Sequence, residues 1–410
     1  MDKLHDIDSN RFQALSGDFN TKRANIMQHQ NIVFHGLLKH IPWGIFNSLV
    51  DKHKTDVRVR KLSTKTQFIA LLYGQFSGVK SLRDIETNLK SHSNKLYHLG
   101  AKPICRATLA EANSGRSHEV FSSLLKSMMG MLNRKFRRDS KELIRLIDST
   151  SVSLSGIASE WAKFSDNTCA AKAHIIYDPD SQTPVYVSVT PAKTNDITAA
   201  QLMPIEDNAT YVFDKAYCSY AWWAKLEARG ARFVTRIKSH VKPEFSEERD
   251  VSKDSKFVSD RIGMLPKRQT KNRQNPFKTP IRVIEMTRDC GENIRFITND
   301  LIGSAQDITD LYKRRWAIEL FFKWIKQVLK IKHFLGRSEN AVRIQIAVAL
   351  IAYILLRLAR DSADTAQSIL NYTRLVRANL MHPKTLDKLL KPPTIISRNK
   401  NQLQLDIGEV

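Results

Sequence analysis

The sequence has few cysteines and no long hydrophobic run. Its 410 residues include four cysteines, far apart and without a Cys-x-x-Cys pair. We therefore expect neither a disulfide framework nor a zinc knuckle, and this cysteine usage fits the cytoplasm. The polar, acidic start does not resemble a signal peptide. The most apolar stretch, Ile346–Leu356, is 11 residues long, too short to span a bilayer, so it predicts a buried helix and no membrane partner.

Several catalytic motifs are also missing. There is no Gly-x-x-x-x-Gly-Lys loop, so we expect no nucleotide cofactor. The 12 histidines include no His-x-x-x-His pair, and His174, in an apolar run, is expected to be a core or edge residue. Nothing singles out a serine or tyrosine that would form a covalent link to DNA.

Acidic residues are fewer than basic residues. The chain has 41 Asp and Glu against 65 Lys and Arg, a formal net charge of +24. Hydrophobic residues make up 42%, which is enough for sizeable cores. So large a positive excess calls for a polyanionic partner, and nucleic acid is the leading candidate.

Hydrophobic periodicity divides the chain into segments, and its length suggests roughly two to three domains. Short helices with glycine turns are compatible with a DNA-reading domain, and equally with a plain helical bundle. The predicted segments are a poorly ordered 1–28, a helical 29–140, an α/β region 141–230, a β-rich 231–304, a helical 305–365 and a helical tail 366–410. Within the β-rich part, the basic stretch Lys267–Lys278 is expected to be a loop.

The segment from Tyr312 to Lys326 has an unusual charge pattern. On one helix, Tyr312, Arg315, Glu319 and Lys326 would project within an arc of about 60°. A phenol, a carboxylate and two cations on one strip suit a groove better than a core. The alternative is a solvated helix with an ordinary Arg315–Glu319 pair.

Two upstream aspartates each follow a predicted strand. Asp148 comes after the run at 143–147, and Asp214 comes after the run at 210–213. A single aspartate at such a place is more often a turn former, but strand ends can present side chains to a shared cleft. With Glu319, three carboxylates could converge on one site. Phosphodiester chemistry uses such hard oxygen ligands for Mg²⁺ or Mn²⁺.

These residues resemble a known family. Tyr312-x2-Arg315-x3-Glu319-x6-Lys326 matches the Tyr-Arg-Glu-Lys signature of the bacterial DDE transposases of the insertion-sequence-four family. Leu-Ile-Asp148-Ser-Thr and Phe-Asp214-Lys-Ala-Tyr are similar to the sequences around the family's first and second catalytic aspartates. The likeness extends over about residues 30 to 345.

The resemblance implies an α/β fold with an RNase H-like catalytic core, formed by 141–230 and 305–365 and interrupted by the β-rich insertion 231–304. It implies catalysis and binding of two Mg²⁺ ions, or Mn²⁺ as a substitute, by Asp148, Asp214 and Glu319. The reaction would be cleavage at the ends of the element and joining of the 3′-hydroxyls to target DNA. The partners would be double-stranded DNA, both terminal inverted repeats and target, and a second copy in a homodimer. The expected DNA contacts are Tyr312, Arg315, Lys326, Arg236 and Lys238.

Two other functions fit the same residues. A non-catalytic DNA-binding regulator derived from a transposase would keep the basic surface without needing the carboxylates. An RNase H-like nuclease would cut without joining. Some relatives stack a flipped base on a tryptophan of the insertion, but this chain has no tryptophan between Trp223 and Trp316, so no residue is assigned that role. Tyr217 and Arg236 are at least as compatible with a structural role.

Overall fold

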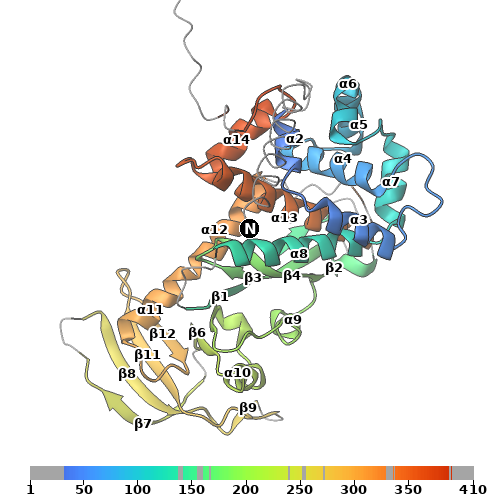
Figure 1. Ribbon diagram of the computed structural model, residues 1–410. Coiled ribbons are helices and arrows are strands. Elements are labelled where there is room, and N and C mark those ends of the chain that lie inside the picture. The colour runs from blue at the N-terminus through green and yellow to red at the C-terminus, as the bar shows by residue number, and fades with distance from the viewer. Residues whose placement is uncertain are drawn as a thin grey trace, which may run out of the picture.

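The computed structural model describes residues 32–136, 142–154, 160–165, 168–238, 241–251, 255–270, 273–328, 336, 338–386 and 389. The predicted segment 1–28 and the end of the predicted tail lie outside this part of the chain. Figure 1 shows a mixed α/β molecule with helices packed around one large sheet.

Short helices make up the first described region. They are α2 (Val33–Leu38), α3 (Trp43–Lys52), α4 (Thr64–Ser77), α5 (Leu82–Ser91), α6 (Ser93–Leu96), α7 (Arg106–Gly115) and α8 (Glu119–Phe136), with the 3₁₀ turn η2 (Tyr97–Leu99). Pro42 separates α2 from α3, as the sequence predicts. Ser81 caps α5 by accepting a hydrogen bond from the Asp84 amide. Gly78 ends α4 at φ +72°, a conformation that glycine adopts without strain.

One predicted helix is two. The periodicity over 108–132 indicates a single helical run, but the chain breaks between α7 and α8. Arg116 is extended there, and its guanidinium donates to the Gln67 side chain. The amide of His118 donates to the Asn340 side chain at 3.0 Å. Contacts with distant residues therefore override the local periodicity.

Ten strands form one continuous sheet in the described part of the chain. In sheet order they are β2 (Lys163–Ser165), β3 (Thr168–Asp178), β1 (Ile144–Ser153), β5 (Thr210–Phe213), β6 (Arg232–Arg236), β12 (Asn293–Thr298), β11 (Ile281–Thr287), β8 (Phe257–Met264) and β7 (Glu244–Arg249), while β4 (Thr183–Pro191) also pairs with β3. The strands β4, β3 and β1 are antiparallel, whereas β1, β5 and β6 are parallel. From β6 onward the pairing through β12, β11, β8 and β7 is antiparallel again.

Helices cover both faces of the sheet near β1. In Figure 1, α8 lies across β1, β3 and β4, while α9 (Asp196–Ala200) and α10 (Tyr220–Glu227) lie on the other side, near the 3₁₀ turn η4 (Lys215–Tyr217). The helix α13 (Glu339–Ser362) packs against α8 and contains the apolar stretch predicted to be a core helix. This helix is long and apolar enough to cross a membrane, yet 89% of its most apolar window is buried inside the protein. The prediction of a buried helix is confirmed.

The remaining elements are α11 (Ala305–Arg314), α12 (Trp316–Val328), α14 (Ile369–Asn379), the 3₁₀ turn η3 (Glu160–Ala162) and a small hairpin. The hairpin pairs β9 (Arg268–Thr270) with β10 (Arg273–Gln274). It lies within the basic stretch 267–278, so the prediction of a plain loop is wrong there. The hairpin is two short strands of polar side chains, a pattern without the apolar alternation that predicts strands.

Arg145 on β1 holds a buried ion-pair network. Its side chain is 1% exposed, and it donates to Glu206 at 2.7 and 2.9 Å and to Asp178 at 3.2 Å.

We expect Arg145→Met to destabilise the protein by about 3–5 kcal/mol, because Asp178 would remain buried without its cation. Urea denaturation measures this. The matched variant Arg229→Met breaks an exposed ion pair with Asp207 and should lower the free energy of unfolding by at most about 1 kcal/mol. Equal losses of stability in the two variants would contradict the claim that the buried network contributes more.

His174 on β3 has no exposed surface, which confirms its predicted place in the core. Burial is the main cause that lowers the pKa of His174 to about 4, with Asp196 opposing the shift and Lys172 adding to it. As pH falls below about 6.5, the unfolded chain takes up this proton first, so stability is lost between pH 6.5 and 4. We expect the stability difference between the wild type and His174→Gln to shrink by up to about 3 kcal/mol over that window. A difference that does not change with pH would exclude this account.

Candidate active site

Asp148 lies in the middle of β1. The sequence predicts it at a strand end, but β1 continues to Ser153, so that prediction is wrong. What ends near Asp148 is the parallel pairing with β5, whose last partners are Ile147 and Phe213. Beyond this point β1 stays paired with β3, where Asp148 faces Ile175. Pairing with β3 therefore keeps β1 in strand conformation beyond the end of β5, so that Asp148 lies on a rigid strand.

Asp214 follows the last residue of β5, as predicted. Because Ile147 and Phe213 are partners in register, Asp148 and Asp214 are the next residues on adjacent parallel strands. The Asp214 carboxylate accepts a hydrogen bond from the Lys215 amide at 2.6 Å, which fixes it at the start of a 3₁₀ turn. The parallel register thus brings the two aspartates to the same edge of the β1–β5 pair.

Glu319 reaches the site from α12. The predicted continuous helix through the signature residues is in fact two helices, since α11 ends at Arg314 and α12 begins at Trp316. Arg315 joins them, with the Arg315 amide bonded to the Tyr312 carbonyl and the Ile318 amide bonded to the Arg315 carbonyl. These i to i+3 bonds tighten the chain locally. The four signature residues are therefore divided between two helices.

The Arg315 guanidinium lies between two of the candidate carboxylates. It contacts Glu319 Oε1 at 2.6 Å and Asp148 Oδ2 at 3.8 Å. The Arg315 side chain is 15% exposed, against 23% for Asp148 and 30% for Glu319. A half-buried cation thus links α12 to β1. The alternative reading of an ordinary solvated pair does not account for the third partner, Asp148.

The electrostatics of Asp148 link all three carboxylates. Burial raises the pKa of Asp148 to about 6, while the Ser149 amide and Arg315 lower it. The negative charges of Glu319 and Asp214 raise the same pKa. These interactions require the three acidic groups to be near one another. The structure therefore brings Asp148, Asp214 and Glu319 to one region of the molecule.

A pocket of about 370 Å³ opens beside Glu319. It is lined by Thr150 of β1 and by Glu319, Phe322, Lys323, Lys326 and Gln327 of α12. Two lysines at i and i+3 on one helix face the same side. The two lysines and Glu319 come from the same helix, with Thr150 of β1 opposite them, an arrangement suited to a phosphate group next to Glu319. Lys326 thus lines the same pocket as Glu319, and Lys323 is a neighbour that the sequence analysis missed.

The other predicted DNA contacts lie on the flank of this site. Arg236 is the last residue of β6, the strand next to β5, and Lys238 follows it. The ring of Tyr312 packs on Phe296 at 5.0 Å and lies under the Arg315 guanidinium at 5.4 Å. The Tyr312 ring therefore packs against one face of the Arg315 guanidinium. Tyr217 is 1% exposed in a core cluster, a structural position.

A polar network lies on the opposite face of β1. Successive side chains alternate across a strand, so Ser149 points away from the face of Asp148. Ser149 donates to Asp196 Oδ1 at 2.6 Å, and Lys172 donates to the same atom at 3.2 Å. The sequence analysis missed this network, and its only local signal was the polar Asp-Ser-Thr ending of an apolar run. Because Asp196 is remote in sequence, the local pattern could not identify it as the hydrogen-bond partner of Ser149.

The donor chemistry fits a hard divalent cation. Three carboxylates offer the oxygen ligands that Mg²⁺ and Mn²⁺ prefer. Among the residues that the structure describes, however, no three His, Cys, Asp or Glu side chains stand close enough together to hold one ion. Arg315 is the positive charge found between Asp148 and Glu319. The site thus has suitable ligands in a more open arrangement than a formed metal centre.

The chain is similar in sequence to known protein families and to two transposases. Residues 29–102 match a family described as a domain of unknown function, DUF4372. The chain is 37% identical over 287 residues to "Putative transposase y4zB" of Sinorhizobium fredii, covering 70% of this chain and 80% of that protein. It is 28% identical over 271 residues to "Probable transposase for insertion sequence element IS5377" of Geobacillus stearothermophilus, covering 63% and 69%.

The solved structure of a piggyBac transposase synaptic complex with hairpin DNA is also similar, with 11% identity, a TM-score of 0.46, and coverage of 89% of this chain and 83% of that chain. Residues 139–355 match the family described as the transposase DDE domain. This match spans more than half of the chain and includes Asp148, Asp214 and Glu319. Together with its relatives among insertion-sequence transposases, it shows that the chain belongs to the DDE transposase family.

Proposed function

We propose that this protein cuts the ends of an insertion sequence and joins the freed 3′-hydroxyls to target DNA. The observation that carries the proposal is the arrangement around Arg315. Asp148 lies on β1 and Asp214 directly follows the adjacent parallel strand β5, while Arg315 contacts both Glu319 and Asp148. An aspartate that interacts with two further carboxylates, one of which lines a basic pocket, suits phosphoryl transfer on a polyanion.

The strand topology supports an RNase H-like core for this reaction. In the order β4–β3–β1–β5–β6, antiparallel and then parallel, Asp148 lies on the central strand β1 and Asp214 directly follows its neighbour β5. The antiparallel strands β7, β8, β11 and β12 come between α10 and α11 in the chain. The predicted insertion 231–304 also includes β6, but β6 pairs in parallel with β5, so we assign only the strands after β6 to an insertion that separates Asp214 from Glu319 in sequence.

Asp148, Asp214 and Glu319 are assigned as ligands of two Mg²⁺ ions, with Mn²⁺ as a substitute. When bound, such ions activate the attacking oxygen and stabilise the leaving oxygen. The side chains of Lys323 and Lys326 hold the phosphate next to Glu319, and Arg315 orients that carboxylate through its 2.6 Å contact. Arg236 and Lys238 extend the basic surface along the neighbouring strand.

The helical region before β1 is assigned to DNA binding. Arg58, Arg60 and Lys61 are exposed in the turn between α3 and α4. Arg83 and Arg106 are exposed at the starts of α5 and α7. Exposed guanidinium and ammonium groups bind backbone phosphates without reading sequence. The resemblance to transposases of insertion sequences further suggests that two copies act together on the two DNA ends.

Strand cleavage tests the catalytic assignment. We expect Asp148→Asn, Asp214→Asn and Glu319→Gln each to lower cleavage of duplexes carrying the inverted repeats by about a thousandfold or more. DNA binding should persist, because these residues are not the phosphate contacts. The control Asp310→Asn removes an exposed carboxylate paired with Lys313 on α11 and should keep full activity. Chelation of divalent ions should stop cleavage by the wild type.

Retained cleavage in any one of the three variants would overturn the assignment. Strand transfer is measured in the same reactions, using a labelled target. Cleavage without joining would instead identify a nuclease, and DNA binding without cleavage by the wild type would identify a regulator.

Salt dependence tests the DNA-binding surface. Neutralising phosphates releases counterions, so the affinity for duplex DNA should fall by at least about a thousandfold between 50 and 200 mM salt if six or more phosphates are contacted. Arg60→Gln should reduce the slope of log K against log salt by about 0.9. Fluorescence anisotropy measures both. An affinity that is unchanged over this salt range would remove the electrostatic basis of the assignment.

A further inference from the structure

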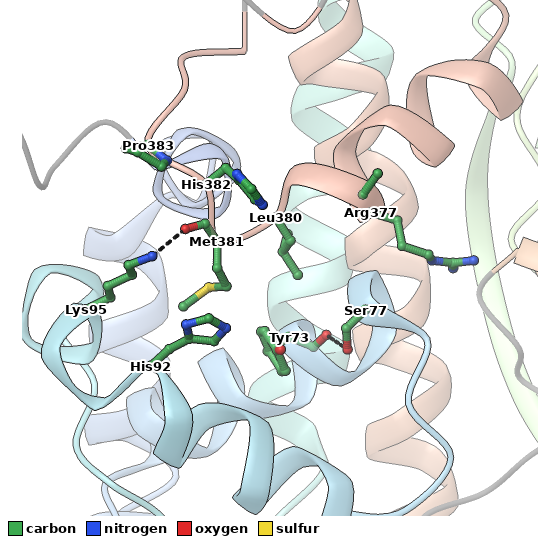
Figure 2. Close-up of a pocket in the computed structure, with 10 residues that line it drawn as sticks. Tyr73, Ser77, His92, Lys95, Arg377, Leu380, Met381, His382 and Pro383 are labelled. Carbon is green, nitrogen blue, oxygen red and sulfur yellow. Dashed lines mark hydrogen bonds between the residues drawn. The ribbon is translucent and has the colours of Figure 1, made fainter. Parts of the chain in front are cut away.

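A second basic pocket lies far from the carboxylates, where the first helices meet the end of the described chain. Its volume is about 280 Å³. Tyr73 and Ser77 of α4 form its floor, His92 and Lys95 come from the α5–α6 junction, and His382 comes from the segment after α14. Figure 2 shows these side chains around a common space. Folding thus brings together basic side chains from the first helices and from the segment after α14, which are remote in sequence.

The lining of this junction pocket has one sign of charge. No aspartate or glutamate is among its lining residues, whereas it includes Lys95, Arg377 and two histidines. Arg377 has a structural task, because its Nε donates to the Phe76 carbonyl at 2.9 Å and its guanidinium points away from the space in Figure 2. The groups facing the space are therefore His92, Lys95 and His382, with the Tyr73 hydroxyl beside them.

Lys95 is held in place by a neutral partner. Its Nζ donates to the Met381 carbonyl at 2.8 Å, which uses one of three N–H donors, and a carbonyl carries no negative charge to neutralise the ammonium. Burial lowers the pKa of His92, and the positive charges of Lys95 and His382 lower it further. This mutual repulsion shows that the three groups share one electrostatic environment. An anion between them would remove the repulsion and supply acceptors for their N–H groups.

We propose that the junction pocket binds a phosphate group through His92, Lys95 and His382. The ligand chemistry is a tetrahedral oxyanion, supplied either by the DNA backbone or by free phosphate. The backbone source rests on the proposed function, since it requires duplex DNA to reach the helical region. Binding there would join the first helices to the segment after α14, because His382 and the Met381 carbonyl belong to that segment.

Inorganic phosphate tests the pocket without any DNA. In the full-length protein, NMR of the histidine rings follows each titration at constant ionic strength with and without orthophosphate. We expect phosphate to raise the pKa of His92 and His382 by about half a unit or more, because an anion favours the protonated ring. His98, which does not line the pocket, should show no phosphate response. Lys95→Gln keeps a donor for the Met381 carbonyl and should weaken the response, whereas Lys90→Gln, exposed on α5, should not.

Duplex DNA distinguishes the source of the phosphate. If the backbone enters the pocket, Lys95→Gln and His382→Gln should each lower the salt slope of DNA binding by up to about 0.9. An unchanged slope with an intact orthophosphate response assigns the pocket to free phosphate. Histidine titrations that do not respond to orthophosphate or to DNA would overturn the proposal. None of these readouts involves cleavage, so they stand apart from the test of the catalytic carboxylates.

Discussion

The contact of Arg315 with Asp148 and Glu319 is the interaction on which the site depends. Two carboxylates brought together from β1 and α12 repel each other, and a positive charge between them makes their approach favourable. Arg315 supplies that charge at the junction of α11 and α12, where the helix direction is set by the tighter i to i+3 bonds. Its position over the Tyr312 ring supports the guanidinium from the other side.

The sheet supplies the rigid part of this arrangement. The register between β1 and β5 places Asp148 and Asp214 next to each other, while the antiparallel pairing with β3 keeps Asp148 on an ordered strand. Beneath it, Ser149, Lys172 and Asp196 satisfy one another on the opposite face. Rigid strands with satisfied polar neighbours hold functional side chains more accurately than loops do.

The sequence predicted the bounds of those elements that are determined by interactions between residues close in sequence. The strand Thr210–Phe213 has the predicted bounds, because a short apolar run defines it. The extension of β1 beyond Asp148 was missed, since it depends on pairing with β3, and the break at Arg315 was missed because helical periodicity continues across it.

Contacts between remote segments escaped the sequence analysis for the same reason. Asp196 joins Ser149 only after the sheet forms, and His382 meets His92 only after α14 packs against α4. The signature from Tyr312 to Lys326 named most of the site because its members are close in sequence. Lys323 was overlooked because it belongs to no family motif, although it lines the same pocket as Lys326.

The positive charge of the chain is organised rather than diffuse. Lysines line the pocket beside Glu319, and a second group of cations surrounds the junction pocket near the first helices. Beside the first pocket, Arg315 is the cation in contact with both Asp148 and Glu319. A divalent cation is the natural competitor for that place, since it offers more charge to the same oxygens.

Binding of Mn²⁺, followed by electron paramagnetic resonance in the absence of DNA, tests this central claim most directly. The account predicts that the wild type binds Mn²⁺ and that amide substitution of any one of the three carboxylates weakens binding by at least about tenfold, since loss of even an outer-shell partner costs that much. Mn²⁺ binding of wild-type strength in the Asp214→Asn protein would contradict the claim that the three carboxylates act as one site.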